Sequence, residues 1–160
     1  MKAIVAYSSR TGNTERLART AQDVLGAGTL LTPVDSAPDP GDAELVAVGF
    51  WLKAGEPDPG AAAYLQKVGR RKLFLFATHG AAVDSDHARN ALNVARSLAG
   101  SARIVGTFSC QGEVEPGFLE KAMAKTPRPP WVDAAVHAVG HPNTADLDRL
   151  REILIRLKNG

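Results

Sequence analysis

The 160-residue sequence contains one cysteine, Cys110, and no long hydrophobic run. A lone cysteine excludes an internal disulfide and a multi-cysteine metal site. No apolar stretch approaches the roughly 18 residues that a helix needs to cross a bilayer. The first apolar run, Ala3–Tyr7, is also too short for a signal peptide. We therefore expect a cytoplasmic protein with no part in the membrane.

Neither sign of charge dominates the chain. The 19 basic and 17 acidic residues leave a formal net charge of +2, too little to indicate a nucleic-acid-binding surface. The histidines show no metal-ligand spacing with one another or with Cys110, so we expect no metal. Apolar residues make up 44% of the chain and charged residues 22%, which is typical of a folded protein. The length fits a single domain over residues 1–160.

Short apolar runs alternate with longer amphipathic stretches along the chain. The runs do not alternate polar with apolar residues, which is typical of strands buried on both faces of a parallel sheet. The four clear runs are Ala3–Tyr7, Leu45–Phe50, Leu73–Ala77 and Ile104–Phe108. A weaker run, Thr29–Val34, contains a proline, so we expect an edge strand there.

Helical patterns fill most of the gaps between these strands. They cover residues 17–25, 61–68, 88–98 and 147–157, while 119–123 predicts at most one helical turn and 35–42 a loop. Either Asn143 or Thr144 can cap the last helix. This order predicts an α/β protein, a three-layer sandwich with a parallel sheet and helices on both of its faces.

Ligands of such sheets bind beyond the carboxyl ends of the strands, so the loops there are the candidate site. The loop after the first strand concentrates hydroxyl groups, an amide and a glycine at a helix N-terminus, which favours an anion. It has neither GxGxxG nor the Gly-Lys-Ser/Thr of a triphosphate loop, so it predicts a phosphate monoester site. A polar turn with a helix cap is the alternative. The candidate residues are Ser9, Arg10, Thr11, Gly12, Asn13 and Thr14.

Two further loops carry candidate ligand contacts. Trp51 follows the third strand and can either stack on a flat ring or simply pack. Thr78 and Gly80 can hydrogen-bond the edge of a heterocycle, and His79 is either a proton donor or a structural residue. Cys110 has no partner and is expected to be a buried thiol.

Together these segments resemble the flavodoxin family. Residues 9–14 are similar to its S/T-x-T-G-x-T phosphate loop, and residues 141–147 to the H-P-x-x-x-D-L start of its last helix. The triplets at 49–51, 78–80 and 110–112 resemble a branch with GFW and CQG motifs. The resemblance implies a five-stranded sheet of order 2-1-3-4-5 and non-covalently bound FMN. It places the phosphate on residues 9–14 and the isoalloxazine between the loops that start at Phe50 and Thr78. The further cofactor contacts that it implies are Phe50, Trp51, Leu52, Thr78, His79, Gly80, Cys110 and Gln111.

The resemblance implies a carrier that shuttles electrons between a reductase and an acceptor enzyme, and we favour this carrier role over that of an independent enzyme. The alternative is an FMN-dependent oxidoreductase acting directly on a small quinone- or tetrapyrrole-like substrate. A signalling receiver domain is disfavoured because no carboxylate follows the first strand. We expect a monomer that meets redox partner proteins, and its charge of +2 favours a neutral or acidic partner. The segment Lys125–Trp131 is either a docking segment or a rigid connector, and we expect the connector because its prolines fix the backbone.

Overall fold

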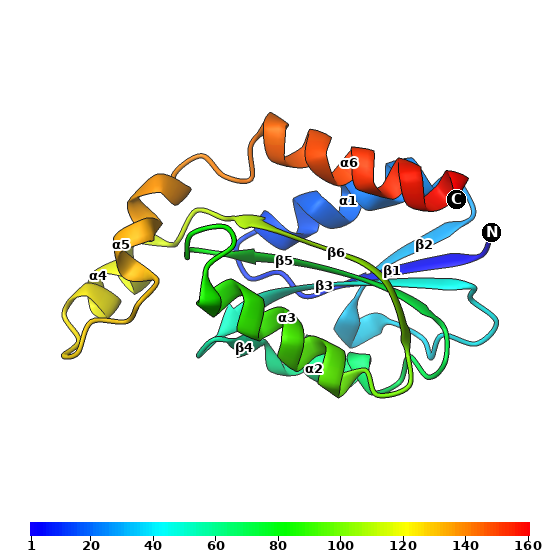
Figure 1. Cartoon of the computed structure of the whole chain (residues 1–160), viewed down its shortest axis with the longest axis horizontal. Coiled ribbons are helices and arrows are strands. Elements are labelled where there is room, and N and C mark those ends of the chain that lie inside the picture. The colour runs from blue at the N-terminus through cyan, green and yellow to red at the C-terminus, as the bar shows by residue number, and fades with distance from the viewer.

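Five parallel strands run through the centre of the molecule (Figure 1), and the computed structural model describes residues 1–160. The strands are β1 (Ala3–Tyr7), β2 (Thr29–Pro33), β3 (Leu45–Lys53), β5 (Lys72–His79) and β6 (Arg103–Gln111). Their spatial order is β2-β1-β3-β5-β6, with Val5 paired to Leu31 on one side and to Ala47 on the other. The order 2-1-3-4-5 of the parallel strands is confirmed, and β2 is an edge strand as its proline predicted.

The sheet has a sixth strand that the sequence did not predict. Strand β4 (Glu56–Pro57) pairs antiparallel with the end of β3 through Lys53 and Glu56. Ala54 and Gly55 form the turn between them, both with positive φ, at 51° and 78°. A two-residue turn with positive φ at both positions is the hairpin turn whose twist matches that of its strands. The expected count of five was therefore wrong because β3 runs on past Phe50 into this hairpin.

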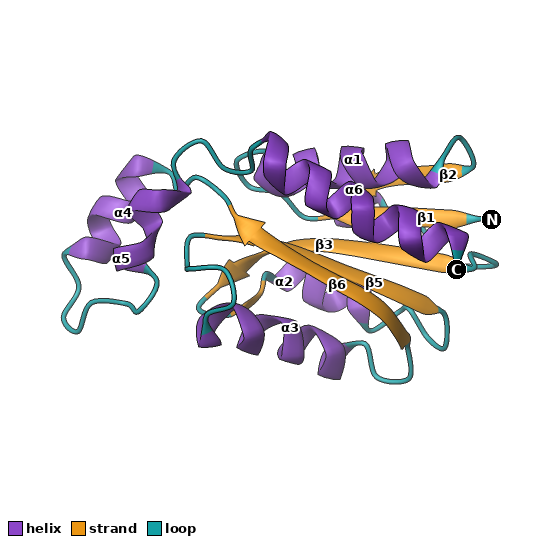
Figure 2. Cartoon of the chain, turned by 45° about the horizontal axis from the view of Figure 1, so that its top comes forward, coloured by secondary structure: helices purple, strands orange, loops and turns teal.

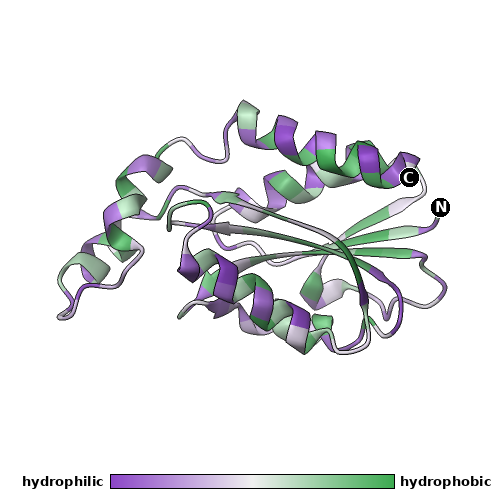
Figure 3. Ribbon diagram, viewed as in Figure 1, coloured by the Kyte–Doolittle hydropathy of each residue, from purple (hydrophilic) through white to green (hydrophobic).

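Two helices cover each face of the sheet (Figure 2). Helices α1 (Asn13–Leu25) and α6 (Thr144–Asn159) lie on one face, and α2 (Pro59–Leu65) and α3 (Asp86–Leu98) on the other. Alternate strand residues face the two layers: Val5 belongs to the core under α1 and α6, and Ile4 to the core under α2 and α3. The strand side chains that face either layer are apolar, which explains the uninterrupted hydrophobic runs that Figure 3 shows along the strands.

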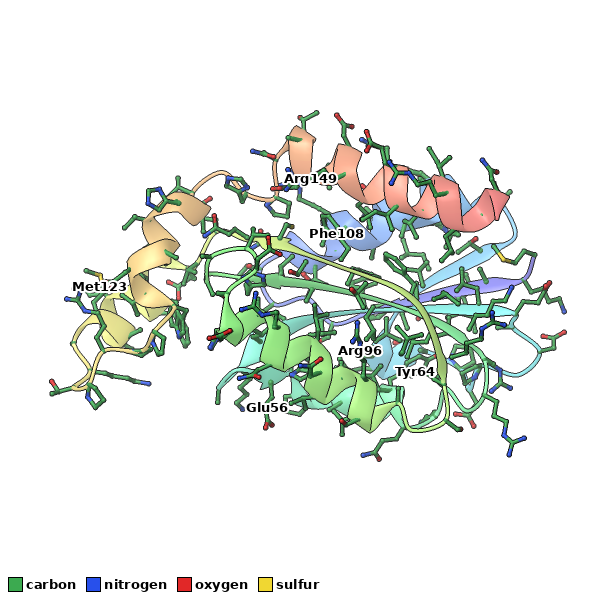
Figure 4. The ribbon with its side chains drawn as sticks, in the orientation of Figure 1. Glu56, Tyr64, Arg96, Phe108, Met123 and Arg149 are labelled. Carbon is green, nitrogen blue, oxygen red and sulfur yellow. The ribbon has the colours of Figure 1, made fainter.

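Close packing and end caps hold these layers in place. Phe108, labelled in Figure 4, is buried with the residues of α1 and α6. A Cβ added at Gly49 would overlap the ring of Phe76, so that position in β3 requires glycine.

Asn143 caps α6: its side chain accepts from the N–H of Asp146, whose carboxylate accepts from the N–H of Asn143. This reciprocal pair satisfies two helix-end donors.

The chain leaves the sandwich after β6 and forms a helical projection (residues 113–140) at the carboxyl end of the strands (Figure 1). It contains α4 (Pro116–Met123), α5 (Val132–Ala135) and one 3-10 turn (Val136–Ala138). Another 3-10 turn, Val34–Ser36, follows β2 in the sandwich. The expectation of at most one helical turn at 119–123 was wrong. Glu115 accepts from the N–H groups of Gly117 and Phe118 and so starts α4 earlier. No helix of the structure has the length and apolar character that crossing a membrane requires.

Candidate functional site

A cavity of about 490 Å³ opens at the carboxyl ends of β1, β3 and β5. This volume lies in the range of roughly 300–1,000 Å³ that small-molecule sites occupy. Parallel strands end at the same edge, so the topology brings the three predicted loops together there. The predicted residues that line the cavity are Ser9, Arg10, Thr11, Asn13, Thr14, Trp51, Leu52, Thr78, His79 and Gly80.

The loop at residues 9–14 leaves the first turn of α1 free for a ligand. Gly12 adopts φ 95°, and its N–H donates to Ser9 Oγ at 3.1 Å. The first N–H groups of any α-helix have no intrahelical partner, and no side chain caps those of α1. A Cβ at Gly12 would meet no atom within 4 Å, which leaves the backbone open on that side. Free N–H groups and the helix dipole both favour an anion at this end.

A buried hydrogen bond joins the first loop to the third. Thr14 Oγ1 lies 2.8 Å from Thr78 Oγ1, and both side chains are buried. One hydroxyl donates to the other, so the accepting hydroxyl keeps its own hydrogen for another group. The pair fixes the start of α1 against the end of β5 and leaves one O–H donor for a ligand.

His79 is neutral and has one unpartnered nitrogen. Its Nδ1 lies 3.0 Å from the carbonyl oxygen of Ala81, which can only accept, so Nδ1 carries the hydrogen. Burial lowers the pKa of His79 to about 4, although the bond to Ala81 acts in the opposite direction. Nε2 is buried without a protein partner. At neutral pH it is a hydrogen-bond acceptor with no proton to give, which disfavours the predicted proton-donor role.

Aromatic rings from two distant segments line the other end of the cavity. Trp51 comes from β3, while Phe118 and Trp131 come from the projection. The rings of Phe118 and Trp131 stack with centroids 5.9 Å apart at 10°. The Arg10 guanidinium carbon lies 5.6 Å from the centroids of both Trp51 and Phe118. Such contacts between a cation and a ring are attractive, so Arg10 links the phosphate loop to both aromatic walls.

The projection is held to the sandwich by side-chain amides that the sequence did not single out for this role. Gln111 donates to the carbonyl oxygens of Gly80 and Ala134, at 3.3 and 3.0 Å. Asn13 donates to the carbonyl of Glu113 at 3.0 Å. These bonds connect the first and third loops to the projection and so position its aromatic rings at the cavity.

Buried Asp58 fixes the β3–β4 hairpin. Its carboxylate accepts from the N–H of Trp51 at 3.3 Å and from that of Ala61, at the start of α2, at 3.2 Å. Carboxylates that bond backbone N–H groups commonly cap helices, and this one also holds the backbone of Trp51. Asp58 was not among the residues predicted from the sequence, although an aspartate followed by proline is a common start signal for a helix.

Some predicted residues do not line the cavity, and some lining residues were missed. Phe50 and Cys110 are fully buried in the two cores, and burial raises the pKa of Cys110 to about 12. Gln111 acts on the cavity only through its bonds to the projection, and Gly12 shapes the first loop. The missed lining residues are Lys53, Ala54, Gly55, His87, Gly112, Glu113, Val114, Glu115, Phe118 and Trp131. Lys53 ends β3 and Ala54 and Gly55 follow it, while Gly112 and Glu113 follow β6, so the position of these five at the end of a strand was the signal that could have found them. His87 and the later residues of the projection reach the cavity only through tertiary packing.

Comparisons with known proteins agree with this architecture. The model of the flavodoxin domain family matches residues 4–155. The flavodoxin-like domain-containing protein BilS of Clostridium symbiosum is 29% identical over 180 residues, covering 97% of this chain and 95% of its own. A flavodoxin of Streptococcus pneumoniae TIGR4 superposes with a TM-score of 0.64 at 13% identity, covering 98% of each chain. A flavoprotein of Lactobacillus acidophilus, solved in complex with FMN, superposes with a TM-score of 0.56 at 13% identity over 68% of this chain and 92% of its own. With more than half of its length matched by the family model, the chain belongs to the flavodoxin domain family.

Proposed function

We propose that the protein binds FMN non-covalently in the 490 Å³ cavity and transfers electrons between redox partner proteins. The observation that carries the proposal is the make-up of this cavity, with anion donors at one end and aromatic rings at the other. A flavin mononucleotide has a phosphate and a flat aromatic ring at its two ends. The FMN bound by the Lactobacillus acidophilus flavoprotein of the same fold supports the choice of cofactor.

The phosphate end of FMN fits the loop at residues 9–14. The hydroxyls of Ser9, Thr11 and Thr14 and the amide of Asn13 can donate to phosphate oxygens, together with the open first turn of α1. Arg10 is the one basic side chain of this loop. Because most of these donors are neutral, the site suits one phosphate monoester better than a polyphosphate.

The ring end of FMN fits the aromatic side of the cavity. Trp51 and the Phe118–Trp131 pair offer apolar faces from two sides. The buried Nε2 of His79 needs a hydrogen-bond donor, since an unpaired buried polar atom costs about 1–3 kcal/mol. FMN has N–H and O–H groups that can satisfy it. The loop at residues 78–85, which begins at the end of β5, has no aromatic residue, whereas the projection brings Phe118 and Trp131 to the cavity.

Each part of the chain has a physical task in this function. FMN, when bound, supplies the reversible uptake and release of electrons at its isoalloxazine ring. The first loop anchors the phosphate, and Trp51 and Phe118 orient the ring and exclude water from its faces. The guanidinium of Arg10, beside Trp51 and Phe118, would attract negative charge on the reduced cofactor. Cys110, with a pKa of about 12, remains a thiol and takes no part.

We propose the carrier function in preference to direct reduction of a small quinone- or tetrapyrrole-like substrate. Such a reduction requires a proton as well as electrons, and neutral His79 has none to deliver at pH 7. The test is anaerobic NAD(P)H oxidation by the FMN-loaded protein with a small quinone as acceptor. We expect no steady turnover until a flavin-dependent reductase is added, and then rapid reduction of the bound flavin. Steady turnover without the reductase would contradict the carrier function.

A further inference from the structure

A second and larger cleft, of about 1140 Å³, adjoins the proposed flavin cavity. It lies between α3, the β3–β4 hairpin and the projection, and Glu56 and Met123 mark the hairpin and the projection in Figure 4. The residues common to both spaces are Lys53, Ala54, Gly55, His87, Phe118 and Trp131. Whatever enters this cleft therefore contacts residues that also line the proposed flavin cavity, Phe118 and Trp131 among them.

The charge of the cleft is positive. Lys53 comes from β3, Lys121 from α4 and Lys125 from the segment after α4, and Glu56 is the only acidic residue in the lining. None of the three lysines forms an ion pair with a carboxylate. The lining of the flavin cavity, in contrast, has two basic and two acidic residues. The near-neutral chain thus places three lysines and one glutamate in the lining of the cleft beside the flavin site.

The projection also carries much of the exposed apolar surface. Of the eight large hydrophobic residues that are exposed, four belong to the projection: Phe118, Met123, Val136 and Val139. Pro129 and Pro130 line the cleft and fix the backbone before Trp131. Of the four exposed residues only Phe118 lines the cleft, where it lies with Trp131 and the three lysines, so the cleft offers both apolar and charged side chains to a partner.

We propose that this cleft is the docking site of a protein redox partner that presents an acidic loop or rim. The inference rests on the proposed electron-transfer function, because docking here brings the partner's redox centre against the aromatic wall of the flavin site. Charge complementarity steers two such surfaces together and orients them on contact. Lys125–Trp131 is then part of an interface as well as the rigid connector expected from its prolines. The lysines are too few and too local to track a nucleic-acid backbone.

The test uses the FMN-loaded full chain and an acidic ferredoxin as electron donor. Photoreduced ferredoxin gives up one electron and the bound flavin gains it, and the rate is followed by stopped flow at low and high salt. The test variant carries Lys121→Glu and Lys125→Glu. The control carries Lys72→Glu and Arg103→Glu, which reverse two exposed, unpaired charges at the opposite, amino end of the sheet.

We expect the test variant to accept electrons at least about tenfold more slowly at low salt, since steering changes association rates by roughly 10–10³-fold. The loss shrinks at high salt, and the control variant behaves like the wild type. With basic cytochrome c as the acceptor from the reduced protein, we expect the test variant to be faster than the wild type. Equal rates for wild type and test variant, with ferredoxin as donor and with cytochrome c as acceptor, would overturn the docking site. Binding of an oligonucleotide in the cleft that blocks electron transfer would overturn it as well.

The affinity for FMN separates the two proposals. Lys121 and Lys125 do not line the flavin cavity, so the dissociation constant for FMN stays unchanged in the test variant. A wild type that binds no FMN would contradict the proposed function itself. A wild type that binds FMN but transfers electrons without regard to these lysines would contradict the docking site alone.

Discussion

At the scale of single residues, buried polar groups decide how the site responds to pH. His79 has a pKa of about 4, well below its ordinary value of 6.5, because burial disfavours its charged form. Asp146 behaves differently: burial raises its pKa, but hydrogen bonds from Asn143 and His141 and the charge of Arg149 outweigh burial, so its pKa is lowered from 3.8. Both shifts favour the form that each group has at pH 7, the neutral imidazole of His79 and the ionised carboxylate of Asp146.

We expect the free energy of unfolding to fall between pH 6.5 and 4 because of His79. Above pH 6.5 the histidine is neutral in both states, and below it only the unfolded chain takes up the proton, which favours unfolding. The difference between the pKa of His79 in the folded and unfolded states corresponds to about 3 kcal/mol in the free energy of unfolding once the unfolded chain is fully protonated and the folded one is not. Urea unfolding of His79→Gln measures this directly, and the variant should lose most of the slope in this range. A slope equal to that of the wild type would show that other groups cause it.

At the scale of elements, the strands and main helices follow from local pattern, whereas the hairpin and the projection do not. Strands β1, β3 and β5 were predictable because both of their faces are buried, which leaves continuous apolar runs. The edge strand β6 is mostly half-buried and has a shorter apolar run. Strand β4 has only two residues and no hydrophobic run. The projection has no strong amphipathic stripe, and Phe118 meets Trp131 only through packing of residues 13 apart in sequence. The predicted phosphate loop lines the cavity as expected, while the aromatic cover required the three-dimensional structure.

The projection should contribute directly to flavin binding through Phe118. We expect Phe118→Ala to raise the dissociation constant for FMN roughly fivefold. An aromatic pair contributes about 0.5–1.5 kcal/mol of binding free energy in addition to the contribution of its buried surface area. Its side chain is 45% exposed, so the variant should fold normally. Fluorescence titration gives the affinity. The fluorescence of the bound flavin should also be quenched less in the variant than in the wild type.

Val136→Ala is the matched control for this variant. Val136 is exposed on the same projection but does not line the flavin cavity, so its removal should leave both affinity and quenching unchanged. Equal weakening by both substitutions would mean that Phe118 acts through the stability of the projection instead of through contact with the ring.

At the scale of the whole molecule, a net charge of +2 describes the protein poorly. The parallel sheet places its ligand loops and the projection at one end, away from both termini (Figure 1). That end combines a balanced flavin cavity with a basic cleft beside it. A similar net charge spread evenly over the surface would give little orientation to a partner, whereas charge gathered beside the cofactor directs the partner to it.

The central claim is that one cavity recognises both the phosphate and the ring of FMN, and parallel calorimetric titrations with FMN and riboflavin test it most directly. Riboflavin has the same ring without the phosphate. Each hydrogen bond to a charged group contributes about 1.5–3 kcal/mol, so FMN should bind at least about tenfold more tightly. Thr11→Val should reduce that difference while leaving the affinity for riboflavin unchanged. Equal binding of the two compounds, or binding of neither, would contradict the account.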